Sequence, residues 1–136
     1  MKIALRIFIA TAAVAIPLSC FAAPAMKDGQ WEITTVMDMP NMPVKIPPQV
    51  MKHCYSKDDV KDQKKVINRD KNCTVKDYSI SGNRVTWKME CTGENAGTMS
   101  GETVFGSDSY DSTMKMVTKG RNMNMKVKAK RVGNCP

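Results

Sequence analysis

The sequence predicts a mainly β fold: a single antiparallel meander of about seven strands that forms a small barrel or a strongly curved half-barrel. Apolar and polar residues alternate through most of the chain, which is typical of strands that bury one face. Gly, Asn and Asp residues interrupt this alternation at regular intervals, as in hairpin turns. Mostly local connections favour a barrel or a curved sheet, since a sandwich divides its strands between two sheets.

The first two strands flank a proline-rich loop. Residues 31–39 alternate apolar and polar side chains and predict a half-buried strand. Four prolines fall within residues 40–48, which predicts an extended loop because proline removes backbone donors and fixes φ. Residues 49–55 form the second, shorter strand.

One short helix is expected between the second and third strands. Ser56 can cap its start, and Asp58 and Asp59 fall in its first turn, next to the positive end of the helix dipole. We expect an exposed helix from Lys57 to about Lys65.

The rest of the chain predicts hairpins. A phase shift near Lys76 and Asp77 predicts a β-bulge in the third strand. The remaining strands are expected at residues 73–80, 85–91, 100–105, 110–118 and 123–130, with turns at residues 81–84, 106–108 and 120–122.

The N-terminus has the pattern of a secretory signal. Lys2 and Arg6 precede an apolar run of about a dozen residues, which is too short for a membrane span of roughly 20 residues. We expect cleavage after Ala22, giving a signal peptide at residues 1–22, a single domain at residues 23–136 and a periplasmic or secreted location. Pro17 stands where lipoprotein signals usually carry Leu, so we do not expect lipid attachment at Cys20.

Export would leave four cysteines in a compartment where disulfides persist, namely Cys54, Cys73, Cys91 and Cys135. Four cysteines allow three pairings, and spacing alone does not choose among them. In an up-and-down meander the first three lie near one end of the sheet. We prefer Cys54 with Cys73, and Cys91 with Cys135.

The charge of the chain bears on its partners. Loss of Lys2 and Arg6 would turn the 21 basic and 13 acidic residues into 19 and 13, a net charge of about +6. This excess favours solubility and also contact with an anionic envelope component. Nucleic acid is a poor candidate, because the basic residues lack aromatic side chains for base stacking.

Methionine is the most distinctive feature of the composition, with 12 in the full chain. Residues two apart on a strand share a face, so paired methionines line one surface and make a soft pocket for an apolar small molecule. The candidate pocket residues are Met37, Met39, Trp87, Met89, Met114, Met116, Met123 and Met125. The alternative is Cu(I) held by thioethers and imidazole, for which the candidates are Met37, Met39, Met42 and His53.

No catalytic residues are expected, and no cofactor apart from copper in that alternative. His53 is the single histidine, and neither a His-Glu-x-x-His nor a paired Cys-x-x-Cys pattern occurs. Ser112 and Lys115 match Ser-x-x-Lys in letters, but residues three apart on a strand point to opposite faces.

Several segments together resemble the domain of unknown function 3617 family of small exported bacterial proteins. They are Gly29-Gln30-Trp31-Glu32, the Met-Pro run 37–43, Cys54 before an acidic helix, Asn72-Cys73-Thr74-Val75, Trp87-Lys88-Met89-Glu90-Cys91 and Arg131-Val132-Gly133-Asn134-Cys135. The resemblance implies bacterial export and a one-domain β architecture. It brings no catalytic or ligand residues.

Three functions follow from these observations. The first is a non-enzymatic binding protein for an apolar ligand, an envelope component or a protein partner. The second is a periplasmic copper-binding protein, and the third is a hydrolase inhibitor.

Overall fold

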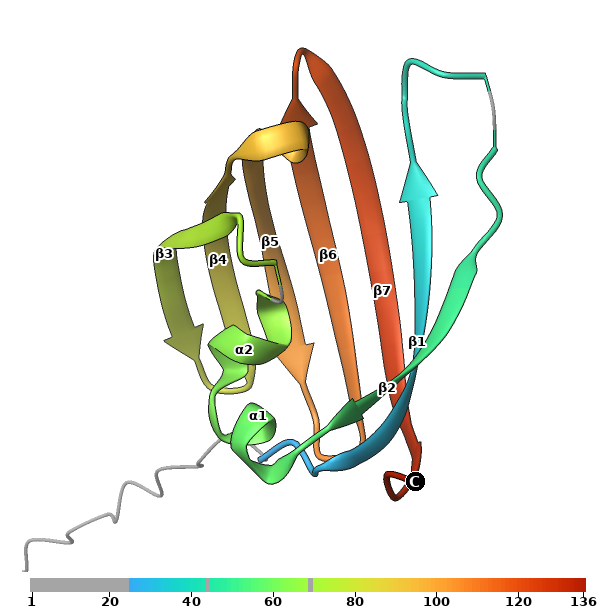
Figure 1. Ribbon diagram of the computed structural model, residues 1–136, viewed down its shortest axis with the longest axis vertical. Coiled ribbons are helices and arrows are strands. Elements are labelled where there is room, and N and C mark those ends of the chain that lie inside the picture. Colours follow the sequence, from blue (N-terminus) through green and yellow to red (C-terminus); the bar gives the residue numbers. More distant parts are fainter. Residues whose placement is uncertain (1–24, 44, 69) are drawn as a thin grey trace, which may run out of the picture.

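The computed structural model describes residues 25–136 apart from residues 44 and 69. The expected signal peptide, and with it Cys20, lies outside the described residues. The elements, labelled as in Figure 1, are β1 (Gly29–Asp38), β2 (Gln49–Tyr55), α1 (Lys57–Lys61), α2 (Gln63–Ile67), β3 (Cys73–Ser81), β4 (Arg84–Cys91), a 3₁₀ turn η1 (Gly93–Asn95), β5 (Gly97–Phe105), β6 (Ser109–Thr118) and β7 (Arg121–Gly133).

The seven strands form one antiparallel sheet in the order β2-β1-β7-β6-β5-β4-β3. Strands β3 to β7 follow one another as the predicted meander, whereas β1 lies between β2 and β7. Within the described residues β2 and β3 do not pair with each other, so the sheet is open and the closed-barrel alternative is not found. Figure 1 shows this open sheet curving around the helices.

The strand order explains the position of the helices. Because β2 and β3 are the two edges of the sheet, the chain between them must cross one face, and α1 and α2 lie on this path (Figure 1). We call the face that they cover the inner face and the opposite one the outer face.

The expected single helix is in fact two helices of five residues each. Asp62 lies between the two helices and has an extended backbone conformation. Its carboxylate accepts a hydrogen bond from the amide N of Lys64 at 3.0 Å. No residue from Lys57 to Lys65 is buried, as expected, although Val60 packs against the core. The buried Val66 lies just beyond the expected end of the helix.

The core occupies one end of the inner face and is rich in aromatic side chains. Trp31, Tyr55 and Phe105 are at most 1 % exposed. The ring centroid of Trp31 lies 5.7 Å from that of Tyr110, and Phe105 packs on the same tyrosine at 5.8 Å. Each buried aromatic ring removes a large apolar area from water, so this cluster anchors β1, β2, β5 and β6 together.

The local features of the meander are confirmed. The register of β3 against β4 shifts between Val75 and Asp77, where the bulge is predicted. Gly82 in the β3–β4 turn has a φ of +60°, a conformation that glycine adopts without strain. On β7, Val127 and Ala129 are buried while the lysines beside them are exposed.

Two disulfides join the four cysteines. Cys73 and Cys91 lie opposite each other in the β3–β4 register with their Cα atoms 4.0 Å apart. Cys54 is joined to Cys135, with the Cα atoms 5.5 Å apart.

The preferred pairing of Cys54 with Cys73 is therefore wrong, as is that of Cys91 with Cys135. It assumed that the second and third strands are neighbours, whereas they are opposite edges of the sheet. Gln30 of β1 pairs with Cys54 on one side and with Gly133 of β7 on the other, which brings the C-terminal segment toward β2.

Candidate functional site

Methionines fill the end of the inner face beyond the aromatic core. They form two neighbouring rows that run across the strands, because side chains at paired positions of an antiparallel sheet share a face. The first row is Met89, Met99, Met116 and Met123 on β4, β5, β6 and β7, and the second is Met114, Met125 and Met37 on β6, β7 and β1.

The methionine rows are more accessible than the core. Met89 is 2 % exposed, and the other six are partly buried. The strands therefore change from aromatic and branched side chains at one end to flexible thioethers at the other, without changing which face points inward.

A hollow of about 300 Å³ lies against these rows, and we call it the methionine groove. Four methionines of the rows line it, and so does the Cys73–Cys91 disulfide. The opposite wall comes from α2 and the residues after it. The lining residues are Ile67, Asn68, Asp70, Cys73, Met89, Cys91, Met99, Met116 and Met125.

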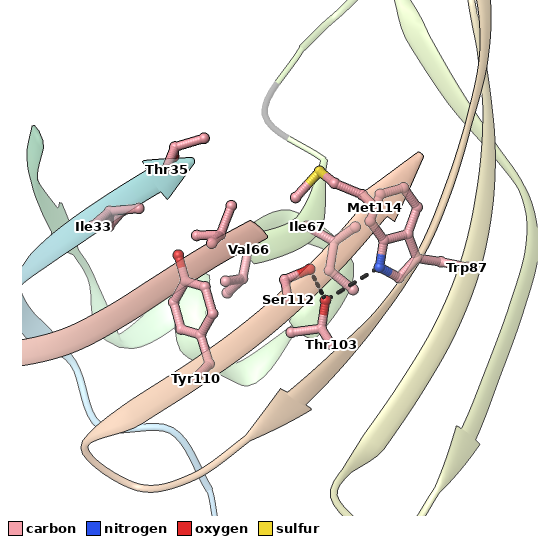
Figure 2. A pocket seen from close by; sticks show the side chains of 10 residues that line it. Ile33, Thr35, Val66, Ile67, Trp87, Thr103, Tyr110, Ser112 and Met114 are labelled. Carbon is pink, nitrogen blue, oxygen red and sulfur yellow. Dashed lines mark hydrogen bonds between the residues drawn. The ribbon is translucent and has the colours of Figure 1, made fainter. Parts of the chain in front are cut away.

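A second, smaller cavity of about 80 Å³ lies next to the groove, between α2 and the sheet (Figure 2). Ile67 lines both spaces, so α2 separates them. Val66 and Met114 line the smaller cavity together with core residues.

A chain of hydroxyl groups lies along the smaller cavity, as the dashed lines in Figure 2 show. The indole N–H of Trp87 donates to Thr103 Oγ1 at 3.2 Å, and the Thr103 and Ser112 hydroxyls are 2.8 Å apart. Ser112 Oγ donates to the carbonyl of Glu102 at 3.1 Å, so Thr103 must donate to Ser112. Every donor in this chain thus has an acceptor.

The position of the Trp87 indole depends on Gly101. Gly101 is the register partner of both Trp87 and Met114. A Cβ at Gly101 would lie 2.7 Å from Cζ2 of Trp87 and 2.9 Å from Cβ of Met114, so the missing side chain makes room for the indole.

Tyr78 connects α2 to the edge of the sheet. Lys64 Nζ of α2 lies 4.8 Å from the centre of the Tyr78 ring, and the Tyr78 hydroxyl is 3.5 Å from the side-chain oxygen of Gln63. Partial burial, with a smaller contribution from the charge of Asp62, raises the pKa of Tyr78 above its usual range. The tyrosine therefore stays neutral at physiological pH and can donate a hydrogen bond.

Seven of the eight predicted pocket residues lie on one face of the sheet, and three of them, Met89, Met116 and Met125, line the methionine groove. Trp87 and the six methionines at positions 37, 89, 114, 116, 123 and 125 lie on the inner face. Met39 follows the end of β1 and, with Met42 and Arg121, lines a separate hollow between the β1–β2 loop and the β6–β7 turn.

The four predicted copper ligands do not form a single group, although Met39 and Met42 line the same hollow. His53 pairs with Trp31, whereas Met37 lies six positions further along β1, or about 20 Å at 3.3 Å per residue. The imidazole of His53 instead packs against Tyr55, with ring centroids 4.5 Å apart. Within the described ranges no three His, Cys, Asp or Glu side chains form a group that could hold a metal ion.

The two residues of the Ser-x-x-Lys pattern lie on opposite faces of the sheet, as expected. Ser112 is 5 % exposed on the inner face, whereas Lys115 is exposed on the outer face. A nucleophile and a base on opposite faces do not meet.

Several contributors to the groove were missed from sequence, namely Ile67, Asn68, Asp70, Met99 and the Cys73–Cys91 disulfide. Met99 precedes the strand predicted to start at residue 100, although it is in phase with Thr103 and Phe105 and an earlier start would have found it. Ile67 lies just beyond the expected end of the helix. The Cys73–Cys91 disulfide was missed because the pairing was wrong.

The fold and the site together define a small disulfide-linked domain, an open antiparallel sheet with a methionine-lined groove on its inner face. A family model described as a protein of unknown function, DUF3617, matches residues 26–135, and the chain belongs to this family. Comparisons with curated proteins and with solved structures found no significant match. Among the described residues, no helix is long and apolar enough to cross a membrane.

Proposed function

We propose that this protein is an exported, non-enzymatic binding protein that holds an apolar small molecule in the methionine groove of a half-barrel. The observation that carries the proposal is the pair of methionine rows, six of whose seven members are partly exposed. Three of these six, Met99, Met116 and Met125, line a hollow of about 300 Å³. Methionines that serve only to fill a core would be expected to be fully buried.

The lining suits a flexible apolar ligand. Methionine has three rotatable bonds and a polarizable sulfur, so it adapts to different ligand shapes. The volume lies at the lower end of the range for small-molecule sites, which favours a narrow ligand such as a single alkyl chain over a bulky ring system.

The helix α2 supplies an adaptable wall. It has five residues, of which only Val66 is buried, and such a short helix depends on packing for its stability. A ligand longer than the groove would displace α2 and reach the smaller cavity of about 80 Å³.

The outer face supports a role in the bacterial envelope. Lys126, Lys128 and Lys130 project from β7 on this face, where Lys128 forms an ion pair with Asp111 at 3.1 Å. The mature chain has a net charge of about +6 if residues 1–22 are removed. We propose that this surface contacts anionic envelope components while the inner face holds the ligand.

The test is a titration with N-phenyl-1-naphthylamine, an uncharged apolar dye whose fluorescence rises on burial, followed by displacement with hexadecanol. We expect saturable binding to the protein from residue 23 onward. Met116→Gln should weaken binding about tenfold, because an unpaired amide in an apolar site costs about 1–3 kcal/mol.

Met42→Gln is the matched control, since Met42 is 47 % exposed and lies outside the groove. It should bind the dye as the unaltered protein does. Failure of the dye to bind, or equal binding by both variants, would rule out the methionine groove as the site.

A further inference from the structure

Four methionines of the β6–β7 hairpin form a square on the inner face. Met114 pairs with Met125, and Met116 pairs with Met123. All four are partly exposed, so a small ion in solution can reach them. We call this group the methionine square.

The spacing of a β-hairpin places the four sulfurs around a common point. Paired Cβ atoms on neighbouring strands are about 5 Å apart, and residues two apart on one strand are separated by about 6.7 Å. Each Cβ of the square is therefore about 4 Å from its centre. The sulfur is the second atom beyond Cβ on an unbranched side chain, so all four sulfurs can turn toward a single ion above the centre.

The chemistry of these donors selects the ion. Thioethers are soft, neutral ligands that suit Cu(I), whereas hard cations prefer oxygen. All four cysteines of the described chain are in disulfides, so they offer no competing thiolates. Asp70 lines the same hollow as Met116 and Met125, so the hollow holds one carboxylate besides these two methionines of the square.

We propose that the methionine square is a binding site for one soft monovalent cation, Cu(I) or its analogue Ag(I). This site differs from the set predicted from sequence, because it uses neither His53 nor the methionines of the β1–β2 loop. It goes beyond the binding of an apolar molecule in the groove, which uses two of these side chains, Met116 and Met125, for their shape and not for their sulfur lone pairs.

The experiment is an anaerobic competition for Cu(I) between the protein and bicinchoninate, read from the absorbance of the bicinchoninate complex. We expect the unaltered protein to withdraw one equivalent. The variant Met116→Leu/Met125→Leu removes two diagonal sulfurs and keeps the apolar surface. Its affinity for Cu(I) should fall by more than the roughly 10- to 100-fold that loss of a supporting group costs at metal sites.

Met39→Leu/Met42→Leu is the matched control, since both methionines line the separate hollow beside the β1–β2 loop. It should retain the affinity of the unaltered protein. Absence of competition by the unaltered protein would overturn the proposal, and so would a loss confined to the control or shared equally by both variants.

The same variants separate this proposal from the proposed function. Met116→Leu/Met125→Leu keeps apolar side chains in the groove, so it should still bind N-phenyl-1-naphthylamine. Dye binding without Cu(I) binding in the unaltered protein would leave the apolar site standing and reject the metal site. Cu(I) binding without dye binding would reject only the apolar site.

Discussion

At the scale of single residues, the hydroxyl group of Thr103 connects two other side chains beside the smaller cavity. Its hydroxyl accepts from Trp87 and donates to Ser112, and it is 3 % exposed. A buried polar group is tolerated when all of its hydrogen bonds are made, and its loss leaves the partners unpaired. The Thr103 hydroxyl therefore supplies the hydrogen bond that satisfies the buried Trp87 N–H.

We expect Thr103→Val to lower the free energy of unfolding by about 1–3 kcal/mol, because it leaves the Trp87 N–H without an acceptor while keeping the side-chain shape. Urea denaturation followed by circular dichroism measures the loss. Thr113→Val is the matched control on the exposed face of β6 and should change stability by less than about 0.5 kcal/mol. Equal effects of the two substitutions would show that the buried hydroxyl contributes no net stability.

At the scale of elements, the two short helices depend on their first residues. Ser56 Oγ accepts from the amide N of Asp59 at 3.2 Å, and the amide N of Ser56 donates to the Asp59 carboxylate at 2.9 Å. The Ser56 hydroxyl also donates to this carboxylate at 2.6 Å. The Ser56 side-chain and backbone hydrogen bonds, in that order, lower the pKa of Asp59.

The lowered pKa of Asp59 makes the stability of the folded state depend on pH. A carboxyl group whose pKa is lower in the folded state stabilises that state fully above its unfolded value of about 3.9. The contribution is lost as the pH falls through the folded-state pKa. The capping box of α1 is therefore strongest at neutral pH and weakens in acid.

We expect Ser56→Ala to raise the pKa of Asp59 toward its usual value, measured by NMR titration of the side-chain carboxyl carbon. Stability at pH 7 should fall by about 1 kcal/mol, the usual cost of a lost N-cap. The difference from the unaltered protein should shrink as the pH is lowered below 4. Ser79→Ala, at an exposed position of β3, serves as the control, and an unshifted Asp59 pKa in Ser56→Ala would contradict the assignment.

At the scale of the whole molecule, the two disulfides fasten different parts of the fold and close loops of different length. Cys73–Cys91 spans 18 residues and fastens the β3–β4 hairpin at the groove. Cys54–Cys135 spans 81 residues and fastens the C-terminal segment to the edge strand β2. A longer loop restricts the unfolded chain more strongly, so the second disulfide should contribute more stability.

Loss of Cys54–Cys135 in the double alanine variant should cost about 4.5 kcal/mol, and loss of Cys73–Cys91 about 3 kcal/mol, on the basis of loop length alone. Urea midpoints of the two variants measure the difference. Non-reducing peptide mapping of the unaltered protein provides the control on connectivity. A larger loss for Cys73–Cys91 would mean that strain or packing at the groove outweighs loop entropy.

The candidate site was predicted in part because its residues follow a local rule. Met114 and Met116, like Met123 and Met125, are two apart on strands whose phase is readable from Tyr110 and from Val127. Which strands lie side by side is not local. The row that joins Met37 to Met125 exists because β1 pairs with β7, and these strands are about 90 residues apart in the chain.

Local sequence is enough to predict most of the strands, their turns, the bulge in β3 and the inward or outward phase of the side chains, because alternation is a property of the extended backbone of each segment. The tertiary structure alone decided the strand order, the crossing of α1 and α2, the disulfide pairs and the gathering of methionines into two rows. These depend on which distant strands bury their apolar faces together, and local periodicity is the same for every such arrangement.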